Sequence, residues 1–140
     1  MLLSGLLSLL ISMQASVGGP VLTRALTLVG SPYRFGGINA ERGFDCAGFT
    51  RYSYEAAGVE LPRDSRSQFA TGWAVRRDDL KPGDLVFFRN TYRPGISHVG
   101  LYIGEGLFVH AASTRREVSV DRLDQPYYNA RFAGARRVLP

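Results

Sequence analysis

The stretch SHVGLYIGEGLFVHA, residues 97–111, decides the fold, because its pattern is that of a tight β-hairpin. Apolar residues alternate with others on both sides of Gly104-Glu105-Gly106, a natural three-residue loop between antiparallel strands. With that loop, Ile103 faces Leu107 and the numbers of paired residues sum to 210. The stretch therefore predicts two antiparallel strands in a defined register.

That register places both histidines of the chain on one face of the sheet. His98 is expected opposite Ala112 and His110 opposite Gly100, which makes the two imidazoles diagonal neighbours. Diagonal side chains lie roughly 7–8 Å apart at the backbone, within reach of long polar groups. A shift of one residue would put the histidines on opposite faces and leave two unrelated side chains.

The segments around the hairpin predict helices first and strands afterwards. Helical patterns cover residues 21–29, 46–57 and, for a shorter piece, 65–72. Strand patterns cover residues 85–88, 98–103, 107–111, 118–120 and 133–139. This order favours an α+β domain in which N-terminal helices pack on a central antiparallel sheet.

Composition limits the classes of protein to which the chain can belong. A length of 140 residues fits one domain, and 45% hydrophobic with 21% charged residues is ordinary for a globular protein. The net charge of +5 comes from scattered arginines without a base-stacking motif, which makes nucleic-acid binding the weakest alternative. One cysteine and two histidines argue against a structural zinc site, which usually takes four ligands, so we expect no metal and no cofactor.

Residues 1–16, MLLSGLLSLLISMQAS, contain no charged side chain and are dominated by leucine. An apolar run followed by small residues is typical of a secretory signal peptide, and it is too short for a spanning helix of about 20 apolar residues. The alternative is an extra N-terminal helix packed on the domain, or a membrane tether. In an exported chain, a lone unpaired cysteine suggests a reactive thiol.

Cys46 is expected in the first turn of a helix, directly after the favoured N-cap residue Asp45. The free N–H groups and the dipole at that end favour an anion, so we expect the pKa of the thiol to fall. The alternative is that Cys46 is a small buried apolar residue. With His98 as base and His110 orienting it, Cys46 completes a nucleophilic triad, whose spacing leaves hydrolysis and acyl transfer open.

Several motifs, in sequence order, resemble those of the NlpC-type bacterial cell-wall peptidases. They are SPYRFGG (31–37), FDCAGF (44–49), LPRDS (61–65), LKPGDLVFF (80–88), SHVGLYIG (97–104) and FVHA (108–111). The resemblance extends from about Arg24 to Arg137 and implies a single-domain member with a papain-like fold. It also implies a cysteine peptidase that hydrolyses peptidoglycan stem peptides, usually between the side-chain carboxyl of D-glutamate and a diamino acid such as meso-diaminopimelate.

The resemblance implies a role for each residue of the triad. Cys46 matches the family's nucleophile, His98 its base, and His110 the third polar residue in the following strand. Tyr33 matches a tyrosine that lines the cleft, and its phenol would stabilise an oxyanion beside the backbone N–H of Cys46.

Four further positions concern substrate binding. Asp45 matches a residue implied in substrate placement, with a plain N-cap as an equal alternative, and Arg63 and Ser65 match cleft-side residues. For Arg63 the alternative is surface charge. Position 47 departs from the family, because Ala47 stands where a serine is usual and lacks a hydroxyl that could contact the stem peptide.

The resulting hypothesis is a catalytic domain at residues 17–140, exported to the periplasm or cell envelope of a bacterium, with peptidoglycan stem peptides as substrate. Nucleic acid is not expected as a partner, and an activating partner stays open. An amidase or acyltransferase on the same scaffold is the alternative among enzymes. A non-catalytic wall-binding module is the alternative outside them, although such a module would not need Cys46, His98 and His110 together.

Overall fold

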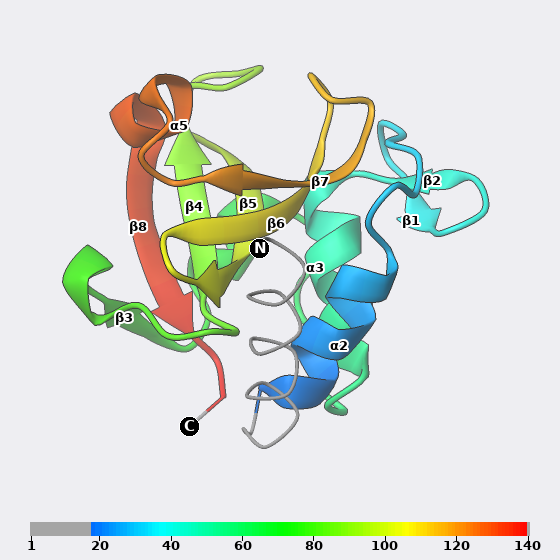
Figure 1. The fold of residues 1–140 in the computed structure, drawn as a ribbon, viewed down its shortest axis with the longest axis horizontal. Coiled ribbons are helices and arrows are strands. Elements are labelled where there is room, and N and C mark those ends of the chain that lie inside the picture. Colours follow the sequence, from blue (N-terminus) through cyan, green and yellow to red (C-terminus); the bar gives the residue numbers. More distant parts are fainter. Residues whose placement is uncertain (1–17, 140) are drawn as a thin grey trace, which may run out of the picture.

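The computed structural model describes residues 18–139, so the segment interpreted as a signal peptide or tether lies outside the described residues. Two helices, α2 (Gly19–Thr27) and α3 (Cys46–Glu55), pack against each other and on one side of a six-stranded sheet (Figure 1). The predicted α+β architecture is therefore confirmed. Within residues 18–139, no helix has the length and apolar character needed to cross a bilayer.

The sheet is antiparallel throughout, with the strand order β3-β8-β4-β5-β6-β7. Its strands are β3 (Trp73–Val75), β4 (Leu85–Arg89), β5 (Ile96–Gly104), β6 (Leu107–Ala112), β7 (Glu117–Arg122) and β8 (Phe132–Arg137). The remaining elements are the small pair β1 (Ile38–Asn39) and β2 (Gly43–Phe44), the helices α4 (Ser65–Gln68) and α5 (Pro126–Arg131), and the 3₁₀ turn η1 (Arg77–Asp79). Of these, β1, β2, β3, η1 and α5 are short and were not predicted.

Both faces of the sheet are covered, which explains why β4 is a continuous apolar run and does not alternate. Leu85 and Phe87 pack into the core under α2 and α3, while Val86 and Phe88 belong to a second cluster on the opposite face. Tyr128 of α5 covers that second cluster. The two clusters make the sheet the central layer between α2 and α3 on one side and α5 on the other.

The predicted hairpin register is confirmed, since Leu101 pairs with Val109 and Tyr102 with Phe108. The loop end differs, because a bulge makes Gly104, and not Ile103, the partner of Leu107. The connection is thus a two-residue turn in which Glu105 and Gly106 both have positive φ, 55° and 76°. Such a turn matches the right-handed twist of the flanking strands, and the bulge absorbs the extra residue.

Local capping sets where α3 begins. The side chain of Asp45 accepts a hydrogen bond from the backbone N–H of Gly48 at 2.7 Å, as expected of an N-cap residue. The helix ends at Glu55, two residues before the predicted end at Ala57. The predicted helix at 65–72 shortens to α4, because the chain turns after Gln68.

Candidate active site

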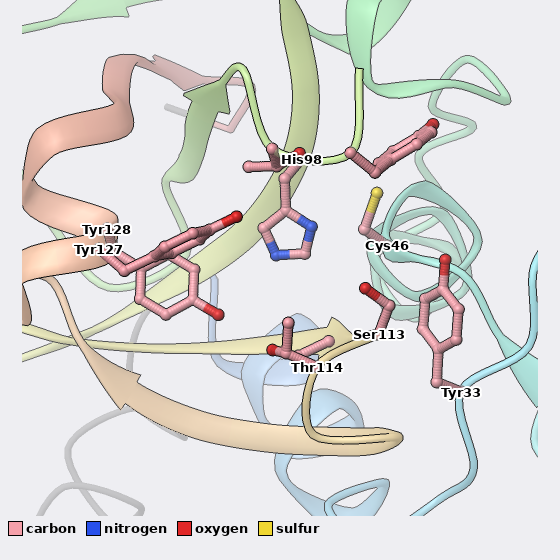
Figure 2. A pocket seen from close by; sticks show the side chains of 10 residues that line it. Tyr33, Cys46, His98, Ser113, Thr114, Tyr127 and Tyr128 are labelled. Atoms are coloured by element: carbon pink, nitrogen blue, oxygen red, sulfur yellow. The ribbon is translucent and has the colours of Figure 1, made fainter.

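A pocket of about 180 Å³ lies at the N-terminal end of α3, where this helix meets the sheet. Its walls come from five places in the chain: the loop after α2, the start of α3, the β4–β5 loop with the adjoining part of β5, the end of β6 with the turn to β7, and α5. The lining residues are Tyr33, Cys46, Thr91, Tyr92, His98, Ala112, Ser113, Thr114, Tyr127 and Tyr128. Figure 2 shows Cys46, Tyr33 and Ser113 on one side of it and Tyr127 and Tyr128 on the other.

The sulfur of Cys46 is close to the sheet yet open to this pocket. The residue is 9% exposed, and one ring nitrogen of His98 faces the sulfur across the pocket (Figure 2). A hydrogen bond from the backbone of Val99, the residue after His98, reaches the thiol. The tertiary fold therefore brings a cysteine on a helix and a histidine on a strand into one reaction space.

The expected fall in the pKa of the Cys46 thiol is wrong. The pKa lies at about 11, above the ordinary 9.0, because burial raises it and the negative charge of Asp45 adds to the effect of burial. Hydrogen bonds with backbone groups of Val99, Ala47 and Cys46 itself act in the opposite direction without overcoming burial. The pKa-lowering effect of the helix N-terminus is therefore smaller than the pKa-raising effect of burial. In the resting state Cys46 is a protonated thiol, which needs a base to remove its proton.

The two histidines form a direct pair. Nε2 of His98 lies 2.7 Å from Nδ1 of His110, and their rings meet edge to face at 74°. Since Nε2 of His98 is engaged in this bond, Nδ1 is the nitrogen that faces Cys46. Gly100 makes the pairing possible, because a Cβ there would lie 3.0 Å from Cβ of His110 and 2.9 Å from Cδ2 of Phe108.

A third group behind the histidines, Asp121, was missed by the sequence analysis. Its Oδ2 lies 2.8 Å from Nε2 of His110, and its Oδ1 accepts a hydrogen bond from the guanidinium of Arg115. The predicted strand at 118–120 ended one residue short of it. Because His110 pairs with Ser119, a strand longer by that one residue would have placed Asp121 on the same face as a diagonal neighbour.

Burial keeps both imidazoles neutral near pH 7. It lowers the pKa of His98 well below the ordinary 6.5, and the neighbouring His110 adds to this while Asp121 opposes it. Burial also lowers the pKa of His110, against the hydrogen bond and the charge of Asp121. A neutral His98 can accept a proton, which is the property required of a general base.

Aromatic rings enclose the histidine pair. The ring centroid of Tyr128 lies 5.3 Å from that of His110, and the ring is stacked on that of His98 with centroids 6.4 Å apart. The ring centroids of Phe108 and His110 are 4.3 Å apart, and those of Phe88 and His98 are 5.8 Å apart. This apolar surrounding removes His110 from water and reduces the contact of His98 with it, and it thereby contributes to the lowered pKa values of both imidazoles.

Tyr33 stands on the Cys46 side of the pocket (Figure 2). Burial raises the pKa of its phenol to about 12, with contributions from the charges of Cys46, Asp45 and Tyr92. The group therefore stays protonated at neutral pH and can donate a hydrogen bond into the pocket, as an oxyanion-stabilising role requires.

The structure leaves the other expected binding residues outside the pocket lining. Asp45 and Arg63 form an ion pair beside it, with Nη2 to Oδ2 at 2.9 Å and Nη1 to Oδ1 at 3.0 Å. Ser65 and Ala47 are each 3% exposed, and neither lines the pocket. Arg63 is therefore more than solvated surface charge, while a contact of substrate with position 47 or 65 has no opening in this conformation.

Pocket residues without any predicted role come from loops and from α5, which lie far apart in the sequence. They are Thr91, Tyr92, Ser113, Thr114, Tyr127 and Tyr128. Loop residues carry no periodic pattern from which a common location could be inferred. Across residues 18–139, no group of three or more His, Cys, Asp or Glu side chains is arranged to hold a metal ion.

A cysteine at a helix N-terminus that faces a histidine pair on an antiparallel sheet defines a papain-like class of α+β domain. Residues 30–137 match the NlpC/P60 family, and the chain belongs to this family. It is 40% identical over 88% of its length to "Gamma-DL-glutamyl hydrolase" of Bacillus subtilis. It is 44% identical over 79% of its length to "Murein DD-endopeptidase MepS/Murein LD-carboxypeptidase" of Escherichia coli.

A solved structure supports the same assignment. The crystal structure of an NlpC/P60 family protein from Bacillus cereus superposes with a TM-score of 0.82 at 37% sequence identity over 88% of this chain. The chain spans 40% of that protein, 30% of the Bacillus subtilis relative and 57% of the Escherichia coli relative. It therefore covers only part of the length of each of these relatives.

Proposed function

We propose that the chain is a cysteine endopeptidase that hydrolyses peptidoglycan stem peptides at the bond between D-γ-glutamate and meso-diaminopimelate. The observation that carries this proposal is the arrangement of Cys46 and His98 across one pocket, with His98 held by His110 at 2.7 Å. A nucleophile, a neutral base and a group that orients the base are the parts that covalent hydrolysis of an amide needs.

The first half of the reaction forms a thioester. As the sulfur of Cys46 attacks the amide carbon, Nδ1 of His98 takes the thiol proton, and the electron pair of the carbonyl moves onto its oxygen. The phenol of Tyr33 and the backbone N–H of Cys46 donate hydrogen bonds to that oxyanion. The protonated His98 then gives its proton to the leaving amine as the carbon–nitrogen bond breaks.

The second half restores the enzyme. His98 removes a proton from a water molecule, whose oxygen attacks the thioester carbon. The carbon–sulfur bond breaks, the sulfur recovers a proton from His98, and the carboxylic acid product leaves. Because the thiol has a pKa of about 11, the proton transfer to His98 is required for attack, and a free thiolate is not the resting state.

The names of the relatives support the substrate class. One is a Gamma-DL-glutamyl hydrolase and another is a murein endopeptidase, so γ-glutamyl linkages and murein peptides are the natural candidates. The net charge of +5 also suits this substrate, since stem peptides carry free carboxylates that arginine can pair with.

The test is the digestion of purified peptidoglycan by the wild type and by Cys46→Ala, with products identified by mass. Release of fragments is expected to fall by at least about 10³-fold in Cys46→Ala, because the covalent step is lost. Ser53→Ala on the same helix is the matched control, since its hydroxyl only bonds back to the carbonyl oxygen of Phe49 at 2.8 Å. Unchanged release by Cys46→Ala would refute the proposal.

A second candidate bond is the D,D-cross-link between stems, which the name of the Escherichia coli relative favours. A defined cross-linked muropeptide separates the two candidates. Cleavage at D-γ-glutamate leaves an L-alanyl-D-glutamate end, whereas cleavage of the cross-link leaves two intact stems. An amidase would instead free the whole stem from the sugar.

We further propose that the chain acts in the cell envelope and that residues 1–16 direct its export. Their uncharged, leucine-rich composition and the wall-related names of the relatives support this proposal. Fractionation of cells that express the full chain, with N-terminal sequencing of the product, tests it. Recovery of uncleaved protein in the cytoplasm alone would contradict it.

A further inference from the structure

We infer that Asp121, held by Arg115, is a positioning residue that fixes the proton arrangement of both histidines, so that Nδ1 of His98 is unprotonated where it faces Cys46. The catalytic consequence of this assignment rests on the proposed function. The assignment itself concerns the hydrogen-bond chain and can be tested without any substrate.

The contacts determine which atom donates in each hydrogen bond between Asp121, His110 and His98. A carboxylate only accepts hydrogen bonds, so Nε2 of His110, 2.8 Å from Oδ2 of Asp121, must carry the proton. A neutral His110 then has a bare Nδ1, which accepts from Nε2–H of His98 at 2.7 Å. A neutral His98 with its proton on Nε2 has a bare Nδ1, the nitrogen that the thiol of Cys46 needs.

Without the carboxylate, the opposite arrangement becomes available. His110 could then carry its proton on Nδ1 and donate to Nε2 of His98. In that case His98 would carry its own proton on Nδ1, pointing at the sulfur, and could not act as a base. Asp121 therefore acts on His98 through His110. Its effect is to keep the proton of His98 on Nε2 and to leave Nδ1 free to accept the proton of the Cys46 thiol.

Asp121 is suited to this role by its own surroundings. The residue is 6% exposed, and burial acts to raise its pKa. Hydrogen bonds from His110 and Arg115 outweigh burial and bring the pKa below the ordinary 3.8, so the group stays a carboxylate. Arg115 occupies the turn between β6 and β7, and its guanidinium binds Oδ1, the oxygen that His110 does not use.

Among residues 18–139, few other charged or titratable groups lie near this chain of hydrogen bonds from Asp121 to His98. Cys46 faces His98 from α3, and Tyr128 faces both rings from α5. Asp45 precedes Cys46 and its charge acts on the thiol, while Tyr33 stands on the Cys46 side of the pocket (Figure 2). Neither group contributes to the shifted pKa values of the imidazoles. Among the described residues with shifted pKa values, Asp121 is thus the acidic group that sets the histidine tautomers.

The test uses the full chain with ¹⁵N-labelled histidine, and NMR reports which ring nitrogen carries the proton. In the wild type near pH 7.5 both histidines are expected to be protonated on Nε2. In Asp121→Asn, His98 is expected to become at least partly protonated on Nδ1. Asp124→Asn is the matched control, since Asp124 pairs with Arg122 by two contacts of 2.8 Å near the same strand end, away from the histidines.

Activity supplies the second readout. We expect kcat/KM of Asp121→Asn to fall about 10- to 100-fold, and the acid limb of its pH profile to move to lower pH, because a negative charge that raises the histidine pKa values is lost. A folding defect alone would lower the amount of active protein without moving that limb. If Asp121→Asn does not fold, Arg115→Gln, a change at a half-exposed side chain, is expected to give a mixture of His98 tautomers.

An unchanged His98 tautomer in the folded variants would overturn the inference. Failure of the proposed function looks different, because the tautomer of His98 would then respond to Asp121→Asn while wild-type and Cys46→Ala proteins digested peptidoglycan equally.

Discussion

Arg63 holds the carboxylate of Asp45 in a two-pronged ion pair, at 3.0 and 2.9 Å, while the same carboxylate caps α3 through the N–H of Gly48 at 2.7 Å. The residue before Cys46 is thereby fixed in place by a side chain from the loop ahead of α4. This contact joins the FDCAGF and LPRDS motifs, which are separate in the sequence. It also keeps a negative charge beside the thiol, and that charge contributes to the raised pKa of Cys46.

Asp45→Asn is expected to lower the pKa of the Cys46 thiol below about 11, because the neighbouring negative charge is removed while Asn keeps the N-cap. The chain has one cysteine, so the pH dependence of its alkylation by iodoacetamide, followed by mass, reports this group alone. The control is Asp64→Asn. Asp64 caps α4 by accepting a hydrogen bond from the N–H of Ser67 at 2.9 Å, and its replacement is expected to leave the thiol pKa unchanged. An unchanged or higher thiol pKa in Asp45→Asn would contradict the assigned cause.

Tyr33→Phe is expected to lower kcat about 10²- to 10³-fold with little change in KM, because it removes one hydrogen-bond donor to the oxyanion. Steady-state kinetics on a defined muropeptide give both parameters. The control is Tyr102→Phe, whose hydroxyl accepts from the N–H of Gly106 at 2.9 Å at the hairpin turn. Equal kinetics for Tyr33→Phe and wild type would remove Tyr33 from the reaction.

Gly100→Ala is expected to destabilise the fold by about 1–3 kcal/mol, because the added carbon would lie 3.0 Å from Cβ of His110 and 3.1 Å from the carbonyl oxygen of Val109. Urea unfolding measures the change in stability. At Gly18 an added carbon would meet no neighbour closer than the carbonyl oxygen of Pro82 at 3.4 Å, so Gly18→Ala serves as a near-neutral control. A stable Gly100→Ala protein with an intact histidine pair would show that β5 and β6 adjust more freely than the structure implies.

The free energy of unfolding is expected to decrease as the pH falls below about 6.5. Both histidines have lowered pKa values in the folded chain, so the unfolded chain binds protons in this range while the folded chain does not. Their contribution to stability is therefore complete above pH 6.5 and is lost toward lower pH, with a slope that approaches about 1.4 kcal/mol per pH unit for each histidine.

Urea titrations between about pH 7.5 and 5 measure this slope, which His98→Gln is expected to reduce by about half. Asp64, Asp121 and Asp124 also have lowered pKa values, but they act below the ordinary carboxylate value of 3.8 and do not contribute in this window. Constant or rising stability toward pH 5 would mean that the folded histidines take up protons freely.

Features of the fold that depend on local sequence were predictable. The alternation in residues 97–111 set the register of β5 and β6, and Asp45 set the first residue of α3. Strand pairing across a tight turn and side-chain capping involve residues close in the chain, so their patterns are visible without tertiary contacts. The bulge at Gly104 was not visible, because it depends on how the turn residues twist the strands.

The properties that depend on burial and on residues distant in the sequence were decided only by the tertiary structure. The helix N-terminus at Cys46 predicted a lowered thiol pKa, whereas packing against β5 removes water and raises it. Asp121 and Arg115 reach the histidines from another strand and turn, and Tyr128 encloses them from α5. Solvation and electrostatics sum over every group that surrounds a side chain, and most of these groups lie far away along the chain.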